Sequence, residues 1–399
     1  MSFPIKQYGL MREGRRPNAY SVSFPDVMSM NGVREDRAVG MMAQVAKGGN
    51  MAVKNDFDTV PIFQRPLVNA TWNAEAHRWT RIVKQGEGGF TLTPQEPYRE
   101  VLYRCRPFWY RMELTGQSGP ERVSVSPEPL PGYTLAPMFR NGQDPVYRPA
   151  FEMGIGADGL PHSRAGLIPL HSDGISLMTQ ARRYDPRARL EGVMDWFSDL
   201  LLLLVEFATW DLDALMNGNR GNVAETGAGM VDLIASSGGV GNGVACVWRG
   251  KENPWKNARS LLCDICLRST PTDSGYETCL YYLPDVRYFD GTVNENYLKV
   301  GTYPDDGTNG VMPIRGFAFQ KGIFYPAHST MQEEELRSIS VLLSDPSDDR
   351  MITVGVGGGS DGNLLPPLLP GMPSLWEAVQ LGHEQSGAFG GRLILDEGG

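Results

Sequence analysis

The stretch that decides the fold reads Trp-Arg-Gly-Lys-Glu-Asn-Pro-Trp-Lys-Asn at residues 248–257, and Phe-Gly-Gly-Arg-Leu-Ile-Leu at residues 389–395 completes it. The first segment sets two indoles among turn-forming and amide residues, and the second is a Gly-Gly bend that leads into a short strand. Neither segment is typical of catalytic machinery. A rigid framework of this kind usually holds binding loops in place. The residues expected to build the framework are Trp248, Arg249, Glu252, Asn253, Trp255, Asn257, Gly390, Gly391 and Arg392.

Length and composition predict a globular, turn-rich protein. The chain has 399 residues, enough for two or three domains, and combines 41% hydrophobic residues with 47 glycines and 29 prolines. A net charge of −9 argues against nucleic acid as a partner, because nucleic-acid binding needs clustered Lys and Arg. The strongest apolar run, at residues 200–205, is far shorter than the ~20 residues of a membrane span. With no signal-peptide pattern at residues 1–8, we expect a soluble protein that is made in a cytoplasm and does not insert into a membrane.

The five cysteines are Cys105, Cys246, Cys263, Cys266 and Cys279. An odd number at irregular spacing does not resemble a secreted disulfide framework. Cys263 and Cys266 have the CxxC spacing of zinc or redox sites, but a zinc site would need a second pair. We therefore interpret the cysteines as small buried hydrophobic residues. The segments 303–309 and 345–349 offer oxygen ligands for calcium, yet the same residue types favour turns.

Three regions are expected along the chain. Residues 1–65 are predicted to form an arm, or a small β segment, that contacts a partner or another subunit. Residues 66–148 predict a β-rich domain that ends in a linker at 127–148, because side chains alternate with a period of two at residues 101–106 and again after Pro107. Residues 149–399 predict an α+β domain.

Two helices are expected near the start of this last region. Residues 174–184 follow Asp173, which suits the N-cap position. Its apolar or small residues are Ile175, Met178 and Ala181. Apolar residues then recur at helical spacing over residues 193–208, which predicts a buried helix. The charged residues expected on its opposite face are Asp195, Asp199 and Glu206. Beyond residue 218 we expect long loops and short strands, such as those at residues 278–283, 339–343 and 351–356.

These motifs, in this order, resemble a known domain. Tyr-Arg-Pro-Ala-Phe-Glu-Met-Gly at residues 147–154, the two helices, the tryptophan motif and the Gly-Gly-Arg-Leu ending are similar to the C-type-lectin-like domain that formylglycine-generating enzymes share with bacteriophage receptor-binding proteins. Pro-Phe-Trp-Tyr-Arg at residues 107–111 lies in a β region that resembles the preceding domain of prophage minor structural proteins. The resemblance covers roughly residues 66–399. It implies a C-type-lectin-like fold for residues 149–399, with two helices beside small antiparallel sheets and long loops.

The chain departs from the enzyme branch of that family. In that branch a reactive cysteine pair near the C-terminus binds copper and oxidises a substrate thiol, whereas no cysteine here lies beyond Cys279. Without a thiolate there is neither a metal ligand of that kind nor a nucleophile. The calcium loops of sugar-binding lectins are also absent from the sequence, and Lys256 stands where the family usually has glycine. We therefore expect a protein that is not an enzyme and that has no cofactor and no bound metal.

In phage proteins of this resemblance the ligand face lies on the loop before the final strand, which corresponds here to residues 357–387. Trp376 is the expected anchor, because indoles dominate the hot spots of interfaces. Alternatively, the leucines of this interval and Trp376 fill a core or a subunit contact. The residues expected to contact a ligand are Asp361, Asn363, Trp376, Glu377, Gln380, His383, Glu384 and Gln385.

The resemblance implies a bacteriophage virion protein on the tail or capsid surface. The first hypothesis is a tail fibre or receptor-binding protein that binds a host-surface glycan or protein through its C-terminal loops. Its other expected partners are virion proteins, through residues 1–65, and further copies of itself in a homotrimer. One alternative is a head-decoration or tail structural subunit without a receptor role. The second is a formylglycine-generating-type oxidase, which the missing C-terminal cysteines disfavour.

Overall fold

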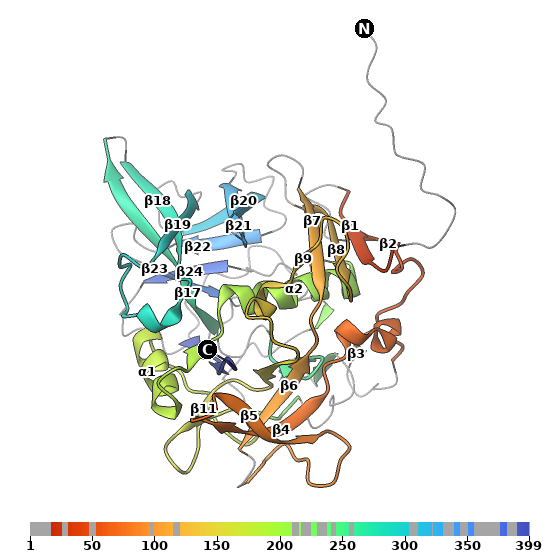
Figure 1. Ribbon diagram of the computed structural model, residues 1–399. Coiled ribbons are helices and arrows are strands. Elements are labelled where there is room, and N and C mark those ends of the chain that lie inside the picture. The colour runs from red at the N-terminus through yellow and green to blue at the C-terminus, as the bar shows by residue number, and fades with distance from the viewer. Residues whose placement is uncertain are drawn as a thin grey trace.

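The computed structural model describes residues 17–25, 31–47, 53–95, 99–114, 120–209, 215–216, 225–229, 238–240, 245–254, 259–273, 275–302, 310–320, 322–329, 339–343, 350–354, 376–380 and 389–398. Over these residues the protein is mixed and sheet-rich, with two α-helices and six β-sheets (Figure 1). Several of the sheets are small and antiparallel, as the sequence predicts.

The described strands of residues 66–148 lie in two antiparallel sheets, one of which also contains two strands from the N-terminal region. Their strands are β1 (Tyr20–Ser23), β2 (Val33–Asp36), β4 (Leu67–Asn73), β5 (Arg78–Lys84), β6 (Glu100–Cys105), β7 (Trp109–Leu114), β8 (Pro120–Ser126), β9 (Thr134–Leu135) and β10 (Val146–Pro149). The five-stranded sheet has the order β2-β1-β8-β7-β9, and the four-stranded sheet has the order β10-β6-β4-β5. The predicted strand at residues 101–106 is confirmed as β6, but the alternation after Pro107 does not continue its sheet. Val101 and Leu102 are as inaccessible as Tyr103, so β6 is buried on both faces rather than half-buried.

The described part of residues 1–65 belongs to the same core. β1 pairs with β8, from Tyr20 opposite Val125 to Ser23 opposite Arg122. Two 3-10 helices, η1 (Asp56–Thr59) and η2 (Pro61–Phe63), bring two fully buried phenylalanine rings together. These rings belong to Phe57 and Phe63, and their centroids are 4.8 Å apart in an edge-on arrangement.

Both predicted helices are confirmed, as α1 (Gly174–Tyr184) and α2 (Val193–Phe207). In α1 the Asp173 carboxylate accepts a hydrogen bond from the Ser176 N–H at 2.9 Å. Of the apolar or small residues named for this helix, Met178 and Ala181 are buried together with Leu177, whereas Ile175 is 43% exposed. Every residue of α2 is buried, and the helix packs against β1 and β8 on one side. Neither α-helix of the described part is long and apolar enough to cross a membrane.

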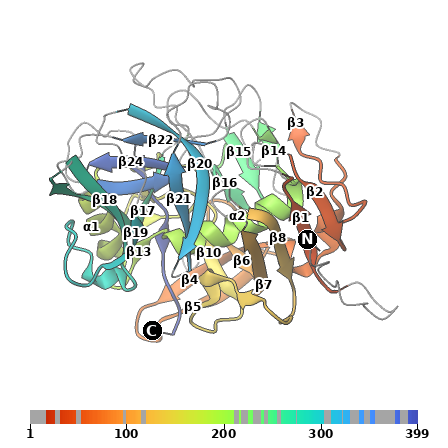
Figure 2. The same cartoon turned by 90° about the horizontal axis from the view of Figure 1, so that it is seen from above.

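A large sheet occupies much of the second half of the chain. It has nine strands: β17 (Arg259–Thr272), β18 (Gly275–Tyr282), β19 (Leu298–Thr302), β20 (Gly310–Gln320), β21 (Ile323–Ser329), β22 (Ile339–Leu343), β23 (Arg350–Val354), β24 (Trp376–Gln380) and β25 (Phe389–Gly390). The three predicted short strands lie in β18, β22 and β23. The expectation that only short strands follow residue 218 is wrong, because β17 has 14 residues and β20 has 11. Figure 2 shows α2 between this sheet and the five-stranded sheet, and α2 contacts both β17 and β21.

Smaller sheets join distant segments. They are formed by β11 (Gly154–Ile155) with β12 (Pro161–His162), by β13 (Arg189–Leu190) with β26 (Leu393–Ile394), and by β3 (Ala46–Lys47), β14 (Gly238–Val240), β15 (Ala245–Trp248) and β16 (Lys251–Glu252). The Gly-Gly bend at residues 390–391 leads into β26, as predicted. Further 3-10 helices are η3 (Pro137–Phe139) and η5 (Val286–Tyr288).

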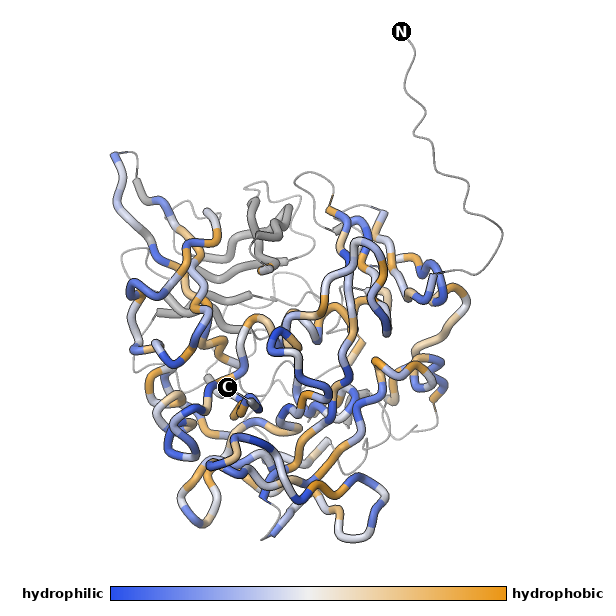
Figure 3. Tube along the Cα trace, in the orientation of Figure 1, coloured by the Kyte–Doolittle hydropathy of each residue, from blue (hydrophilic) through white to orange (hydrophobic). Residues whose placement is uncertain are grey.

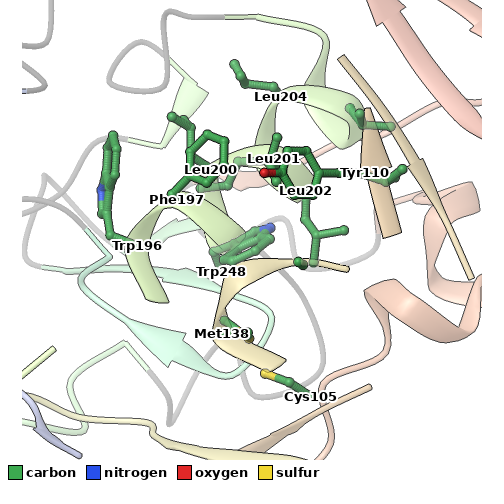
Figure 4. Packing of buried hydrophobic residues seen from close by; sticks show 14 of the residues in the cluster. Cys105, Tyr110, Met138, Trp196, Phe197, Leu200, Leu201, Leu202, Leu204 and Trp248 are labelled. Atoms are coloured by element: carbon green, nitrogen blue, oxygen red, sulfur yellow. The ribbon is translucent and has the colours of Figure 1, made fainter. Parts of the chain in front are cut away.

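One hydrophobic core extends through all three expected regions. It contains Phe57 and Phe63 from the first, Cys105 and Met138 from the second, and α2 with Trp248 from the third. Figure 4 shows Trp248, Met138 and Cys105 in this core together with the leucines of α2, and the Met138 N–H donates to Ser198 of α2 at 3.1 Å. Apolar stretches run along the strands and helices around this core (Figure 3). The segment 127–148, expected as a linker, supplies buried residues at Ala136, Met138 and Phe139.

Candidate functional site

The predicted ligand residues are placed only in part. Asp361, Asn363, His383, Glu384 and Gln385 lie outside the described residues. Trp376, Glu377 and Gln380 lie in β24, which pairs with β22 on one side and with β23 on the other. The interval expected to be a loop therefore contains an internal strand of the nine-stranded sheet. These three residues are brought onto one strand, and their role in binding stays a prediction.

The tryptophan motif forms a tight hairpin over α2. β15 ends at Trp248, β16 begins at Lys251, and these two residues pair across the turn. Arg249 and Gly250 both have positive φ values, 46° and 83°, as a two-residue hairpin turn requires. Glu206 of α2 accepts hydrogen bonds from the Trp248 indole at 2.9 Å and from Arg249 at 2.7 and 2.8 Å. The ion pair with Glu206 therefore holds an arginine in a backbone conformation that usually favours glycine.

Arg392 joins the three segments on which the resemblance depends. Its guanidinium is fully buried and donates to the carbonyl oxygens of Ala150 at 3.2 Å, Asn253 at 2.9 Å and Glu252. Ala150 belongs to the 147–154 segment, and the other two acceptors belong to the tryptophan motif. The side chain of Arg392 is thus a structural bridge at the centre of the fold.

Glu252 and Asn253 also hold backbone rather than a ligand. The Glu252 carboxylate accepts from the N–H groups of Gly227 at 2.9 Å and Gly229 at 2.8 Å. The Asn253 amide oxygen accepts from the Cys246 N–H at 3.1 Å. Both side chains thus bind backbone N–H groups, and the framework role expected for them stays a prediction. Two other members of the motif, Trp255 and Asn257, lie outside the described residues.

The two acidic residues in the first half of α2 are buried ion-pair partners. Asp195 lies 2.8 Å from Arg148 and 2.6 Å from Arg189, and Asp199 lies 2.6 Å from Arg65 and 3.0 Å from Lys251. Burial alone would raise the pKa of each carboxyl, but the cations hold it below its ordinary value. Both carboxylates are therefore ionised and internally neutralised.

The C-terminal segment, residues 396–397, contacts the arginines that pair with Asp195. Asp396 lies 2.7 Å from Arg189 and 3.1 Å from Arg148. Burial opposes its charge, but the two arginines lower its pKa to about 2. Glu397 accepts a hydrogen bond from the Trp79 N–H at 2.7 Å, so the segment contacts β5 as well as the two arginines that pair with Asp195 of α2.

Asp264 differs from these carboxylates. It projects from β17 and accepts a hydrogen bond from the Val193 N–H at 2.7 Å, at the start of α2. A side-chain carbon at Gly192 would lie 2.3 Å from an Asp264 oxygen, so only glycine permits this approach. Burial raises the pKa of Asp264 to about 6, against the hydrogen bond from Val193. The hydrogen bond by which Asp264 caps α2 opposes the rise in its pKa but does not cancel it.

The cysteines are all buried and free, as the interpretation of small hydrophobic residues predicts. The Cys263 thiol lies 3.5 Å from the Leu190 carbonyl oxygen, and burial raises its pKa well above the ordinary value. Burial also raises the pKa of Cys105 to about 11. Such thiols stay protonated at neutral pH and are poor nucleophiles.

Sequence reasoning missed a cluster around His162. Both ring nitrogens face carboxylates, with Nδ1 2.7 Å from Glu100 and Nε2 3.1 Å from both oxygens of Asp158. The ring also meets Tyr184 edge-on at 5.7 Å between centroids. Glu100 lies 62 residues before His162, so no local motif could have signalled the pair.

Comparisons with known proteins identify no relative: no protein-family model matches the chain, and no curated protein matches it. Among the described residues, no group of three or more His, Cys, Asp or Glu side chains is arranged to hold a metal ion. The site that the structure describes best is the set of buried ion pairs between α2, the tryptophan hairpin and the C-terminal segment. We call it the charged junction, and its acidic residues are Asp195, Asp199, Glu206 and Asp396.

Proposed function

We propose that this chain is a bacteriophage virion protein that binds a host surface without chemistry, on a C-type-lectin-like scaffold. The observation that carries the proposal is the buried guanidinium of Arg392, which links all three motif segments of the resemblance. Motif residues that hold backbone in this way support a framework role. Recognition would then fall to loops that the framework carries.

The charged residues of the junction favour binding over catalysis as the role of this fold. Asp195, Asp199 and Glu206 are each neutralised by cations of the same chain. A catalytic acid or base usually needs a pKa near the working pH and access to substrate. Asp195 and Asp199 have lowered pKa values and are buried. They support the fold and leave no proton to exchange with a substrate.

A cell-binding assay tests the proposal. Fluorescently labelled full-length protein is incubated with a panel of Gram-negative and Gram-positive bacterial cells, and bound protein is measured against concentration. We expect saturable binding to at least one cell type and a loss of about tenfold or more for Trp376→Ala, the expected anchor. Tyr288→Ala is the matched control, because it removes an exposed aromatic ring from another part of the chain.

Two outcomes would redirect the proposal. Saturable binding that Trp376→Ala and Tyr288→Ala leave equal would mean that another surface recognises the cell. Failure to bind any cell, together with assembly onto phage particles, would favour the head-decoration or tail-subunit alternative.

The oxidase alternative has its own assay. We expect no copper-dependent oxidation of a peptide thiol above the rate of copper alone, because the thiol of Cys263 is buried and protonated. Copper-dependent turnover that Cys263→Ser abolishes would overturn the non-enzymatic proposal.

A further inference from the structure

The hairpin of β11 and β12 is fixed at both its ends. At its base the Met153 N–H donates to the Gly391 carbonyl oxygen at 2.9 Å, which ties the hairpin to the framework. At its tip the Gly156 N–H donates to the Leu160 carbonyl oxygen at 2.8 Å. Asp158 belongs to this tip, and its carboxylate accepts from the Leu160 N–H at 3.1 Å and faces His162.

The geometry around His162 requires a particular protonation state. A neutral imidazole has one N–H group, but carboxylate oxygens face both ring nitrogens of His162. Where both carboxyls are ionised, both contacts are hydrogen bonds only when both ring nitrogens carry protons, which places a positively charged ring between Glu100 and Asp158. The His162 and Glu100 side chains are each 1% exposed, whereas the Asp158 side chain is 40% exposed.

We propose that Glu100, His162 and Asp158 form a pH-operated latch that holds the tip of the β11–β12 hairpin while His162 carries both protons. Loss of one proton leaves a lone pair on Nε2 facing the Asp158 carboxylate, and the tip is released. The inference does not depend on the proposed function.

When His162 loses a proton, its contact with Asp158 breaks and its contact with Glu100 remains. Glu100 is buried, so bulk solvent does not reach it, and its second oxygen accepts the Ser163 N–H at 2.7 Å. The Tyr184 hydroxyl also bonds to Glu100 from the end of α1. Asp158 is close to solvent, and water can satisfy its oxygens after release.

Among the described residues, arginines also lie around this cluster. Arg99 lies 3.9 Å from Asp158, and the charge of Arg164 opposes protonation of the ring. Burial alone would lower the pKa of His162, but the hydrogen bond and charge of Glu100, with the hydrogen bond of Asp158, raise it above its ordinary 6.5. Because the folded pKa is raised, the stabilisation is complete below pH 6.5 and is lost as the pH rises through the folded value. The latch is therefore closed at pH 6.5, where Asp158 is ionised, and opens as the pH rises through the folded pKa of His162.

Nuclear magnetic resonance of the whole protein tests the protonation state directly. With histidine labelled by nitrogen-15, the His162 signals are identified by their absence in His162→Gln. At pH 6 we expect both ring nitrogens of His162 to be protonated, and we expect that state to persist above pH 6.5. A neutral ring with one N–H at pH 6 would overturn the proposal.

Hydrogen exchange then tests the release of the tip. After correction for intrinsic rates, the Gly156 and Leu160 amides should lose protection by about tenfold as His162 loses its proton, the effect of about one hydrogen bond. Asp158→Asn should show the weaker protection already at pH 6. The matched control is Asp290→Asn, which changes another turn aspartate, one that bonds to Thr292. Equal protection in wild type and Asp158→Asn at pH 6, or an equal effect from Asp290→Asn, would contradict the latch.

Discussion

The two α-helices show how differently one sequence pattern can be stabilised. α1 is capped by its neighbour Asp173 and leaves the Ile175 side chain 43% exposed. α2 is buried along its whole length, and its acidic residues meet cations from distant parts of the chain, such as Arg65 and Lys251. The comparison teaches that the cap of α1 comes from the adjacent residue and its packing from Leu177, Met178 and Ala181, whereas the buried charges of α2 also need cations that tertiary structure supplies.

Two carboxyls at the start of α2, one from the helix and one from β17, differ in a similar way. Asp195 has two arginine partners and a lowered pKa, while burial raises the pKa of Asp264 to about 6. Both carboxyls bond to backbone N–H groups at the first turn, of Gly192 and Val193 respectively. The close cations, rather than the helix terminus, decide which of the two carboxyls has a lowered pKa.

The largest effect is expected where the ion pairs of α2 are broken. Asp195→Asn leaves the buried Arg148 and Arg189 short of a counter-charge and should lower the free energy of unfolding by about 3–5 kcal/mol. Urea unfolding measures the change. Glu87→Gln, which removes the exposed pair with Lys84, should cost less than about 1 kcal/mol. Equal losses in the two variants would contradict the stabilising role of the buried ion pairs of α2.

A somewhat smaller effect is expected at the start of α2. The folded pKa of Asp264 exceeds the ordinary 3.8, so the folded protein binds the extra proton and stability falls as the pH rises from about 4 to about 6. The difference in pKa corresponds to about 3 kcal/mol. Unfolding free energies measured from pH 4 to 7 should show this fall in wild type relative to Asp264→Asn. Parallel curves for the two proteins would mean that Asp264 is ionised like Asp195.

The N-cap of α1 should matter less. Asp173→Ala removes the hydrogen bond to the Ser176 N–H and should cost about 1 kcal/mol of unfolding free energy. Asp173→Asn keeps an acceptor at the same position and serves as the control. A loss in Asp173→Ala as large as that in Asp195→Asn would show that α1 too depends on tertiary partners.

The smallest effect is expected on the outer face of α1. Ile175→Ala should change the unfolding free energy by less than about 1 kcal/mol, because the side chain is 43% exposed. A loss typical of a buried isoleucine, about 2–5 kcal/mol, would mean that this face is covered in solution.

Much of the local structure could be predicted from the sequence, because its signals are local. The Asp173 cap and the helical spacing of apolar residues predicted both helices, and the Gly-Gly bend predicted β26. The nine-stranded sheet was not predicted. In β17 every residue from Leu261 to Leu267 is buried, so the alternation that marks a half-buried strand is missing.

The site was less predictable than the fold, because its contacts join residues that lie far apart along the chain. The motif residues Trp248 and Arg392 were found from their order in the sequence, but their partners lie far away along the chain. Glu206 is 42 residues from Trp248, and Ala150 is 242 residues from Arg392. Glu100 and His162 carry no motif, and only the fold brings them together.

The central claim is that the buried charges of α2 hold the framework and take no part in recognition. The most direct measurement is the affinity of folded Asp195→Asn for the bacterial cells that bind the wild-type protein, at a temperature where the variant is still folded. We predict an affinity equal to that of wild type despite the lower stability. A folded Asp195→Asn protein that no longer binds those cells would contradict the claim.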